Sequence, residues 1–266
     1  MFEHVLVAID FSPAWPRLKQ RLMALQKMGA RRVTLAYVMS SRYPAAPQEG
    51  HRDHYERRLK QEAAGLSEAG FEVETQLLTG EPGRELVQAA ARGQADLLLL
   101  GDRGHGKIHQ FLIGSTAMDA ARLTSLPLWL EPMANGQTDS QEILLLATDG
   151  SKAAASAEAW FEKLESSYQR AIAVSACCAI DGGDCELNDA RLHLEQMAQR
   201  MPGLETRVEQ GDPRDVVVSL ANALPADLIV VGKRGRNAMK QLLLGGTAEA
   251  VCRQVQRPVL LVPVPG

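Results

Sequence analysis

The chain has 266 residues, of which 45% are apolar and 23% charged, with a formal net charge of −3 at pH 7. This composition is typical of a globular protein, and the length predicts about two domains. No apolar run approaches the ~18 residues of a membrane-spanning helix, and the negative charge argues against a general nucleic-acid binder. The four cysteines form no C-x-x-C pair and the N-terminus lacks a basic secretory start, so we expect a cytoplasmic protein with reduced thiols.

Short apolar runs alternate with helical patterns along the chain, which is typical of βαβ units and a parallel sheet. In the first half, we expect strands at 5–9, 33–38, 72–78, 97–100 and 128–130, and helices at 12–28, 54–68, 82–92 and 115–124. In the second half, we expect strands at 143–147, 172–178, 205–209, 228–231 and 259–262, and helices at 152–168, 189–201, 214–223 and 247–255.

The sequence repeats itself. The segment from Ala95 to Gly104 recurs from Ala226 to Gly235, and Asp10 near the start of the first copy recurs as Asp149. The offset between the copies is larger at Asp10 than at Ala95, so the second copy is eight residues shorter. We expect the gap between its second and third strands, opposite residues 43–54. The repeat predicts two duplicated domains, residues 1–133 and 143–266, joined by a polar linker over 134–142. The fold class is α/β, with each copy a doubly wound, five-stranded parallel sheet that carries helices on both faces.

In open α/β sheets, ligands bind beyond the carboxyl ends of the strands. The first strand of each copy ends in an acid, Asp10 or Asp149, and the fourth strand ends in a loop of the form Gly-x2-Gly-x9-Gly that opens a helix. Backbone N–H groups of such a loop and helix N-terminus favour a phosphate, and the acid suits a ribose. The arrangement indicates a nucleotide site; the alternative is that these glycines only make a tight turn.

Other motifs are incomplete. Gly101-x4-Gly106-Lys107 departs from a P-loop at Ile108, where Ser or Thr must bind Mg²⁺, and no G-x-G-x-x-G follows the first strand. Histidine pairs at 51 and 54 and at 105 and 109 have the spacing of metal ligands, but no cluster completes four ligands, so we expect no dedicated metal site. Seven basic residues and no acid lie between Phe11 and Gln48, which indicates either an anion-facing patch or a solvated helix face.

These motifs resemble those of the universal stress protein family, and the chain is similar to a tandem member of it. The resemblance spans both copies and implies a strand order 3-2-1-4-5, which brings the acid beside the glycine loop. It also implies ATP, with Mg²⁺ accompanying the phosphates, bound as a regulatory ligand. The positions expected to bind it are Asp10, Val38, Gly101, Gly104, Gly114, Ser115 and Thr116 in copy one, and Asp149, Cys177, Gly232, Gly235, Gly245, Gly246 and Thr247 in copy two.

Both copies depart from the family pattern at the expected phosphate loop. Copy one keeps the Ser115 hydroxyl, but Asp102 places a negative charge in the loop and Phe11 stands where a glycine is usual. Copy two has Gly246 in place of that serine, within a basic loop that contains Lys233, Arg234, Arg236 and Lys240. We therefore expect the two sites to bind ATP unequally, without ranking them.

The expected function is a cytoplasmic stress-response protein without catalytic residues, whose nucleotide occupancy alters its conformation or its unknown protein partner. A nucleotide-independent interaction scaffold and a slow ATP hydrolase are the alternatives. No nucleic-acid or membrane partner is expected. The exposed apolar edge of a fifth strand needs a cover, so we expect the two halves to form an intramolecular pseudo-dimer through their last strands, with a homodimer as a further arrangement.

Overall fold

A computed structural model describes residues 1–12, 15–40, 48–103, 113–133, 142–177, 184–224, 226–236 and 244–264, without the side chains of 48–51 and 184–186. The described residues form two compact units, which we consider separately: unit 1, residues 1–103 and 114–133, and unit 2, residues 142–264. Gly104, His105 and His109, which the sequence analysis singled out, lie outside the described residues.

Unit 1 is a five-stranded sheet in which every strand pairs parallel to its neighbours, in the order β3-β2-β1-β4-β5. Its elements in chain order are β1 (His4–Ala8), α1 (Trp15–Lys27), β2 (Arg32–Ser40), α2 (Gln48–Glu68), β3 (Glu72–Gly80), α3 (Pro82–Arg92), β4 (Leu97–Gly101), α4 (Ser115–Leu123) and β5 (Leu128–Glu131). The expected fold class and strand order are confirmed.

Unit 2 repeats this architecture with the order β8-β7-β6-β9-β10, again all parallel. Its elements are β6 (Ile143–Ala147), α5 (Ala155–Glu165), β7 (Arg170–Cys177), α6 (Asp184–Arg200), β8 (Glu205–Gln210), α7 (Pro213–Ala223), β9 (Leu228–Gly232), α8 (Gly246–Gln254) and β10 (Val259–Val262).

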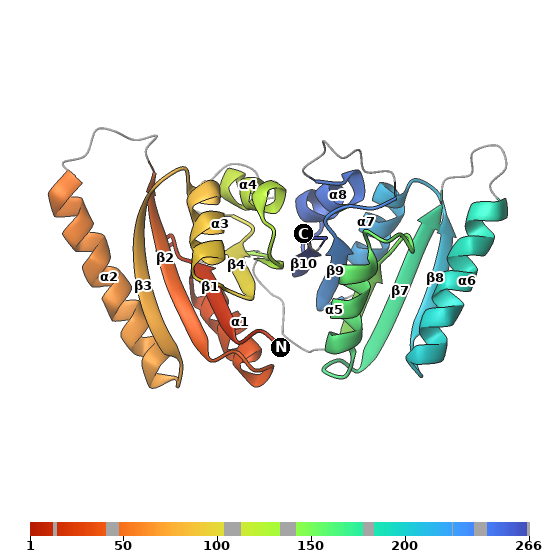
Figure 1. Ribbon diagram of the computed structural model, residues 1–266, viewed down its shortest axis with the longest axis horizontal. Coiled ribbons are helices and arrows are strands. Elements are labelled where there is room, and N and C mark those ends of the chain that lie inside the picture. The colour runs from red at the N-terminus through yellow and green to blue at the C-terminus, as the bar shows by residue number, and fades with distance from the viewer. Residues whose placement is uncertain are drawn as a thin grey trace. The chain divides into compact units, whose positions relative to one another are not determined.

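The helices cover both faces of each sheet because right-handed crossovers change face when the winding direction reverses. In unit 1 the chain winds outward through α1 and α2 and then returns through α3 and α4, which pack against each other (Figure 1). In unit 2, α7 and α8 form the equivalent pair. Because both faces are covered, the central strands are almost wholly apolar and buried, as in β6 and β9.

The pairing register corrects the expected position of the eight-residue gap. Ala8 pairs with Ala36 in unit 1, and the equivalent Ala147 pairs with Val174 in unit 2. The offset between the copies is therefore one residue smaller at the second strand than at the first. One residue of the gap thus lies before the second strand and the other seven lie after it. In this register Val38 corresponds to Ala176, and Tyr37 corresponds to Ser175.

Element bounds differ from the expected ones mainly at the ends of polar helices. Helix α2 begins at Gln48, six residues earlier than expected, and α6 begins at Asp184 instead of 189. Both helices are strongly polar, so their apolar periodicity is weak and marks their first turns poorly.

Candidate functional site

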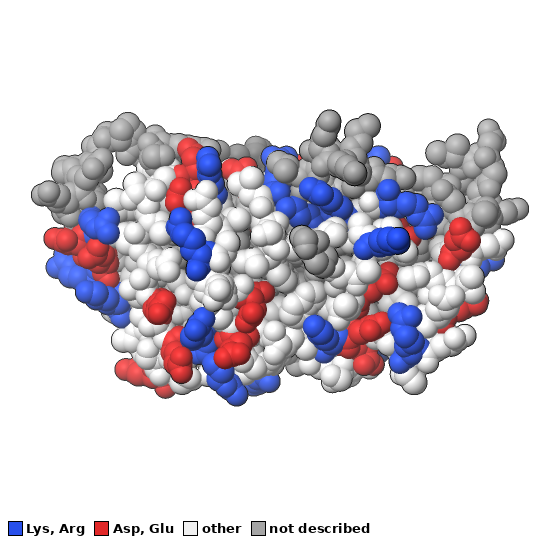
Figure 2. All heavy atoms as spheres, viewed as in Figure 1, with Lys and Arg blue, Asp and Glu red and all other residues white. Residues whose placement is uncertain are grey.

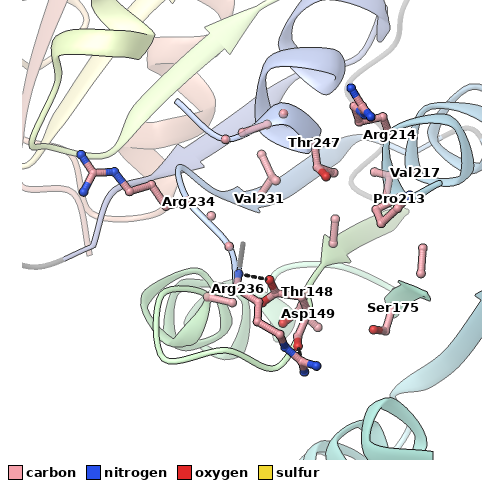
Figure 3. Close-up of a pocket in the computed structure, with 18 of the residues that line it drawn as sticks. Thr148, Asp149, Ser175, Pro213, Arg214, Val217, Val231, Arg234, Arg236 and Thr247 are labelled. Carbon is pink, nitrogen blue, oxygen red and sulfur yellow. Dashed lines mark hydrogen bonds between the residues drawn. The ribbon is translucent and has the colours of Figure 1, made fainter. Parts of the chain in front are cut away.

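Unit 2 contains a cavity of about 390 Å³ at the carboxyl ends of its strands (Figure 3). The ends of β6, β7 and β9 form its walls, together with the starts of α7 and α8. All seven positions expected from the sequence of copy two line this cavity: Asp149, Cys177, Gly232, Gly235, Gly245, Gly246 and Thr247. The strand order explains why, since β6 and β9 are neighbours and bring the acid beside the glycine loop.

The turn after β6 holds Asp149 in place. Its Oδ1 accepts a hydrogen bond from the Ser151 N–H at 3.0 Å, and Gly150 between them has φ +66°. Its Oδ2 accepts from the Arg236 N–H, and the Arg236 guanidinium donates to the Asp149 carbonyl at 2.9 Å. The glycine loop is thereby attached to the end of β6, so close that a Cβ on Gly235 would lie 2.5 Å from Asp149 Oδ2.

The N-terminus of α8 faces the cavity with backbone donors. Its N-cap residue is Gly245, which supplies no side-chain oxygen, whereas the N-cap Asp212 of α7 accepts a hydrogen bond from the Arg214 N–H. Residues 245 to 248 all line the cavity, and Thr247 adds a hydroxyl next to the first helical residue. Free N–H groups and the helix dipole at such an end attract an anion.

Three arginines, Arg214, Arg234 and Arg236, add positive charge around the same cavity. Arg214 donates to Asp212 at 3.1 and 2.9 Å, and Figure 3 shows the Arg234 side chain pointing away from the other labelled residues. Burial, and then the neighbouring Arg234, lowers the pKa of Lys233 to about 8. Figure 2 shows basic side chains gathered around the end of unit 2 where α7 and α8 lie.

A chain of hydrogen bonds connects the Asp149 turn to helices α5 and α6. The Thr148 hydroxyl accepts from the Gly150 N–H at 3.1 Å and donates to the buried Glu158 carboxylate. His193 Nε2 lies 2.8 Å from the same Glu158 oxygen. This buried network fixes the conformation of the turn that presents Asp149.

The cavity residues that were not expected from the sequence include Thr148, Ser175 and Arg214. Thr148 directly follows β6 and Ser175 lies on β7, and nothing in their local pattern distinguishes them. Arg214 was detectable, because the internal repeat places it opposite Gly83. Such a change from glycine to arginine between copies marks a position where the two helix pairs differ.

The structure places the expected residues of copy one at the equivalent strand ends. Asp10 Oδ1 accepts from the Ser12 N–H at 2.9 Å, and the Gly114 N–H donates to the Asp102 carbonyl at 2.7 Å, as the Gly245 N–H does to Lys233 at 2.9 Å. Gly101 ends β4, and Ser115 and Thr116 begin α4. Val38 lies on β2.

Asp102 neither faces solvent nor stands alone. Its carboxylate accepts from the Met133 N–H at 2.9 Å and from Arg103 Nε at 3.2 Å, and burial raises the pKa of the Asp102 carboxyl. The carboxylate is therefore engaged with the backbone that follows β5.

The described part of the chain contains no cluster of three or more His, Cys, Asp or Glu residues arranged to hold a metal ion. Among the same residues, no helix is both long and apolar enough to span a bilayer.

Comparison with known proteins identifies the family. Residues 1–131 and 183–263 match the universal stress protein family. A universal stress protein from Mycolicibacterium smegmatis is 28% identical over an alignment of 263 positions, and the match covers 86% of this chain and 86% of that one. The crystal structure of a universal stress protein from Archaeoglobus fulgidus superposes with a TM-score of 0.79 and 20% identity, over 98% of this chain and 96% of that one.

A further structure shows that the fold occurs in other settings. The cytoplasmic domain of a prokaryotic cation chloride cotransporter superposes with a TM-score of 0.58 and 13% identity, over 98% of this chain and 95% of that one. The fold alone therefore does not decide the ligand. The match to the family model over both halves, together with the tandem repeat, does decide the family: the chain belongs to the universal stress protein family.

Proposed function

We propose that unit 2 binds an adenine nucleotide, ATP with Mg²⁺ on its phosphates, as a regulatory ligand of a cytoplasmic stress-response protein. One observation carries the proposal: the cavity of about 390 Å³ joins a carboxylate, Asp149, to the N-terminus of α8. Small-molecule sites have volumes of roughly 300–1,000 Å³ and combine apolar walls with a few convergent polar groups.

The residues of the cavity suit the three parts of a nucleotide. Ser175 and Cys177 at the end of β7 would contact the base, and Asp149 would accept hydrogen bonds from the ribose. The phosphates would lie at the start of α8, against the backbone of Gly246 and the Thr247 hydroxyl. The arginines around the cavity would add long-range attraction for the triphosphate and its metal.

We propose a binding role instead of efficient ATP turnover. Nucleotide occupancy would change the conformation of the glycine loop, which is attached to Asp149 through Arg236, and so alter association with an unidentified protein partner or a second copy. A slow ATP hydrolase and a nucleotide-independent scaffold are the alternative functions. We propose neither a nucleic-acid nor a membrane partner.

Calorimetric titration of the full chain with Mg²⁺–ATP tests the proposal through two substitutions at one position. Gly246 is exposed, and a Cβ there would meet only Arg214 Cδ, at 3.5 Å, so the fold accommodates a side chain. Gly246→Asp puts a carboxylate where the phosphates would lie and should weaken ATP binding at least tenfold. Gly246→Ala adds the same Cβ without charge and should change the affinity by less than about twofold.

Three results would contradict the proposal or change its class. If the parent protein gives no saturable heat and retains no adenine nucleotide on purification, the scaffold function is favoured. Equal affinities of the alanine and aspartate variants would place the phosphates elsewhere. Phosphate release above background that is lost in Gly246→Asp would indicate the slow hydrolase.

A further inference from the structure

The turn after the first strand of unit 1 differs from that of unit 2 in the side chain at one position. Phe11 follows Asp10 as Gly150 follows Asp149, and the two residues share a left-handed conformation, with φ +57° and +66°. Non-glycine residues rarely adopt this conformation, and bulky ones least of all. The backbone of the turn is thus the same in both units, but in unit 1 it carries an aromatic side chain.

That side chain belongs to a cluster of three rings. The Phe11 ring centroid lies 5.2 Å from that of Tyr37 on β2 and 5.9 Å from that of Tyr55 on α2, and the two tyrosines stack at 4.3 Å. The Arg58 guanidinium carbon lies 4.0 Å from the centroid of the Phe11 ring. Burial, and then a hydrogen bond with Tyr55, raises the pKa of Tyr37.

One ring of the cluster, that of Tyr37, occupies a position that lines the cavity in unit 2. Tyr37 corresponds to Ser175 in the pairing register, and Ser175 lines the cavity. Phe11 corresponds to Gly150, next to the cavity residue Asp149. Unit 1 therefore carries rings at the positions of Gly150 and Ser175. Of these, Ser175 lines the cavity, whereas a Cβ on Gly150 would lie 3.0 Å from the His193 ring. Tyr55 stacks on both Phe11 and Tyr37, as an aromatic ring stacks on the face of a base, and Arg58 adds a cation–π contact with Phe11.

We propose that unit 1 is closed to nucleotide by its own aromatic cluster, that Phe11 and Tyr37 are the residues that close it, and that the chain binds one nucleotide, in unit 2. This inference rests on the proposed function. It assigns unit 1 a permanently filled site, since a base could enter only by displacing three mutually packed rings.

The experiment transfers the open site of the second unit into the first. The double variant Phe11→Gly, Tyr37→Ser carries the side chains found at Gly150 and Ser175, and removes two of the three rings. In calorimetric titration with Mg²⁺–ATP, we expect one equivalent for the parent chain and two for this variant. With Gly246→Asp added, the variant should bind one equivalent. Tyr37→Phe keeps the rings and should still bind one.

The outcomes separate this inference from the proposed function. A parent that binds two equivalents, or a folded double variant that binds no more than the parent, overturns closure. In the second case the proposed function stands if the parent binds one equivalent. A parent that binds none beside a double variant that binds one overturns the proposed function and supports closure.

A second measurement covers the case in which the double variant loses its far-ultraviolet circular dichroism. Ser115 occupies the place of Gly246 in unit 1 and is also exposed. Ser115→Asp in the otherwise unchanged chain should leave both stoichiometry and affinity as in the parent. A loss of one equivalent would show that unit 1 binds nucleotide and would overturn closure.

Discussion

A pair of charged positions shows how the two copies diverged residue by residue. In unit 1, Lys19 forms an ion pair with Glu62, and in unit 2 the equivalent positions hold Glu158 and His193, 2.8 Å apart. The acid lies on the second helix in unit 1 and on the first helix in unit 2, while the contact between the two helices is kept. Only the acid of unit 2 accepts from a strand-end hydroxyl, because Thr148 replaces Ile9. Glu158 therefore holds the Asp149 turn of unit 2 through the Thr148 hydroxyl.

Three basic residues of the stretch between Phe11 and Gln48 pair with acids of unit 1. Arg17 Nε and Arg21 Nε donate to Glu131 at 3.0 and 2.7 Å, and Lys19 pairs with Glu62. These side chains are engaged with carboxylates of their own unit. These three of the seven basic residues therefore do not contribute to the open anion-facing patch that the sequence left as an alternative.

His4 predicts a pH dependence of stability. Arg32 Nη2 lies 2.8 Å from its Nδ1 and always donates, so Nδ1 accepts, and Nε2 donates to Thr34 Oγ1 at 2.8 Å. The ring is therefore held neutral; burial, and then Arg32, lowers the pKa of His4 below 6.5. The unfolded chain then binds more protons below pH 6.5, so this group makes the free energy of unfolding fall as the pH falls through that value.

Urea unfolding between pH 7.5 and 5 tests this prediction. We expect the parent to lose more stability over this range than His4→Gln, in which an amide replaces the titrating ring. Because carboxylates titrate equally in both proteins, the difference between the two pH profiles reports His4. Parallel profiles would contradict the prediction.

At the scale of elements, the helix pair after the third strand packs differently in the two units. A Cβ on Gly83 of α3 would lie 2.7 Å from Asp119 Cβ and 2.9 Å from the Thr116 carbonyl oxygen, so α3 and α4 approach closely there. The equivalent residue of α7 is Arg214, which lines the cavity. Close helix contact in unit 1 and a cavity wall in unit 2 thus arise at one position of the repeat.

Single substitutions at these equivalent positions should differ in their effect on the free energy of unfolding. Gly83→Ala forces α3 and α4 apart and should lower the free energy of unfolding by about 1–3 kcal/mol. Arg214→Ala removes an exposed ion pair with Asp212 and should change it by less than about 0.5 kcal/mol. Denaturant unfolding of both variants measures the difference. Equal losses of stability would show that the two helix pairs pack alike.

At the scale of the whole molecule, each unit ends its sheet on an apolar strand, β5 (Leu128–Glu131) or β10 (Val259–Val262). An outermost strand leaves alternate amides without a partner inside its own sheet, and an apolar edge of this kind is normally covered. We therefore predict that the two units associate through these last strands as an intramolecular pseudo-dimer.

Hydrogen exchange of the full chain tests this prediction. All amides of both last strands should exchange as slowly as those of the central strands β1 and β6, and a tenfold dilution should leave this protection unchanged. Protection that weakens on dilution would indicate a homodimer instead. Fast exchange at alternate positions would mean that the edges are open.

The sequence by itself determined the architecture of both halves and the composition of one site. Alternation of apolar strands with helices, the internal repeat and the right-handed crossover rule were enough for two five-stranded parallel sheets. The strand order that brings Asp149 to the glycine loop was implied only by the resemblance to the universal stress protein family, and the pairing of β6 with β9 confirms it. Polar helix starts, such as that of α2, were placed poorly because they carry little periodic signal.

Only the tertiary structure showed the cavity of unit 2 and the cluster of rings in unit 1. The sequence showed Phe11 as a departure, but Tyr37 and Tyr55 join it from a strand and a helix distant in the chain, and the register that aligns Tyr37 with Ser175 comes from strand pairing. Arg214 likewise meets Gly246 only because α7 packs on α8. The space at a strand end depends on side chains from several elements at once, and a one-residue shift of register changes which of them point into it.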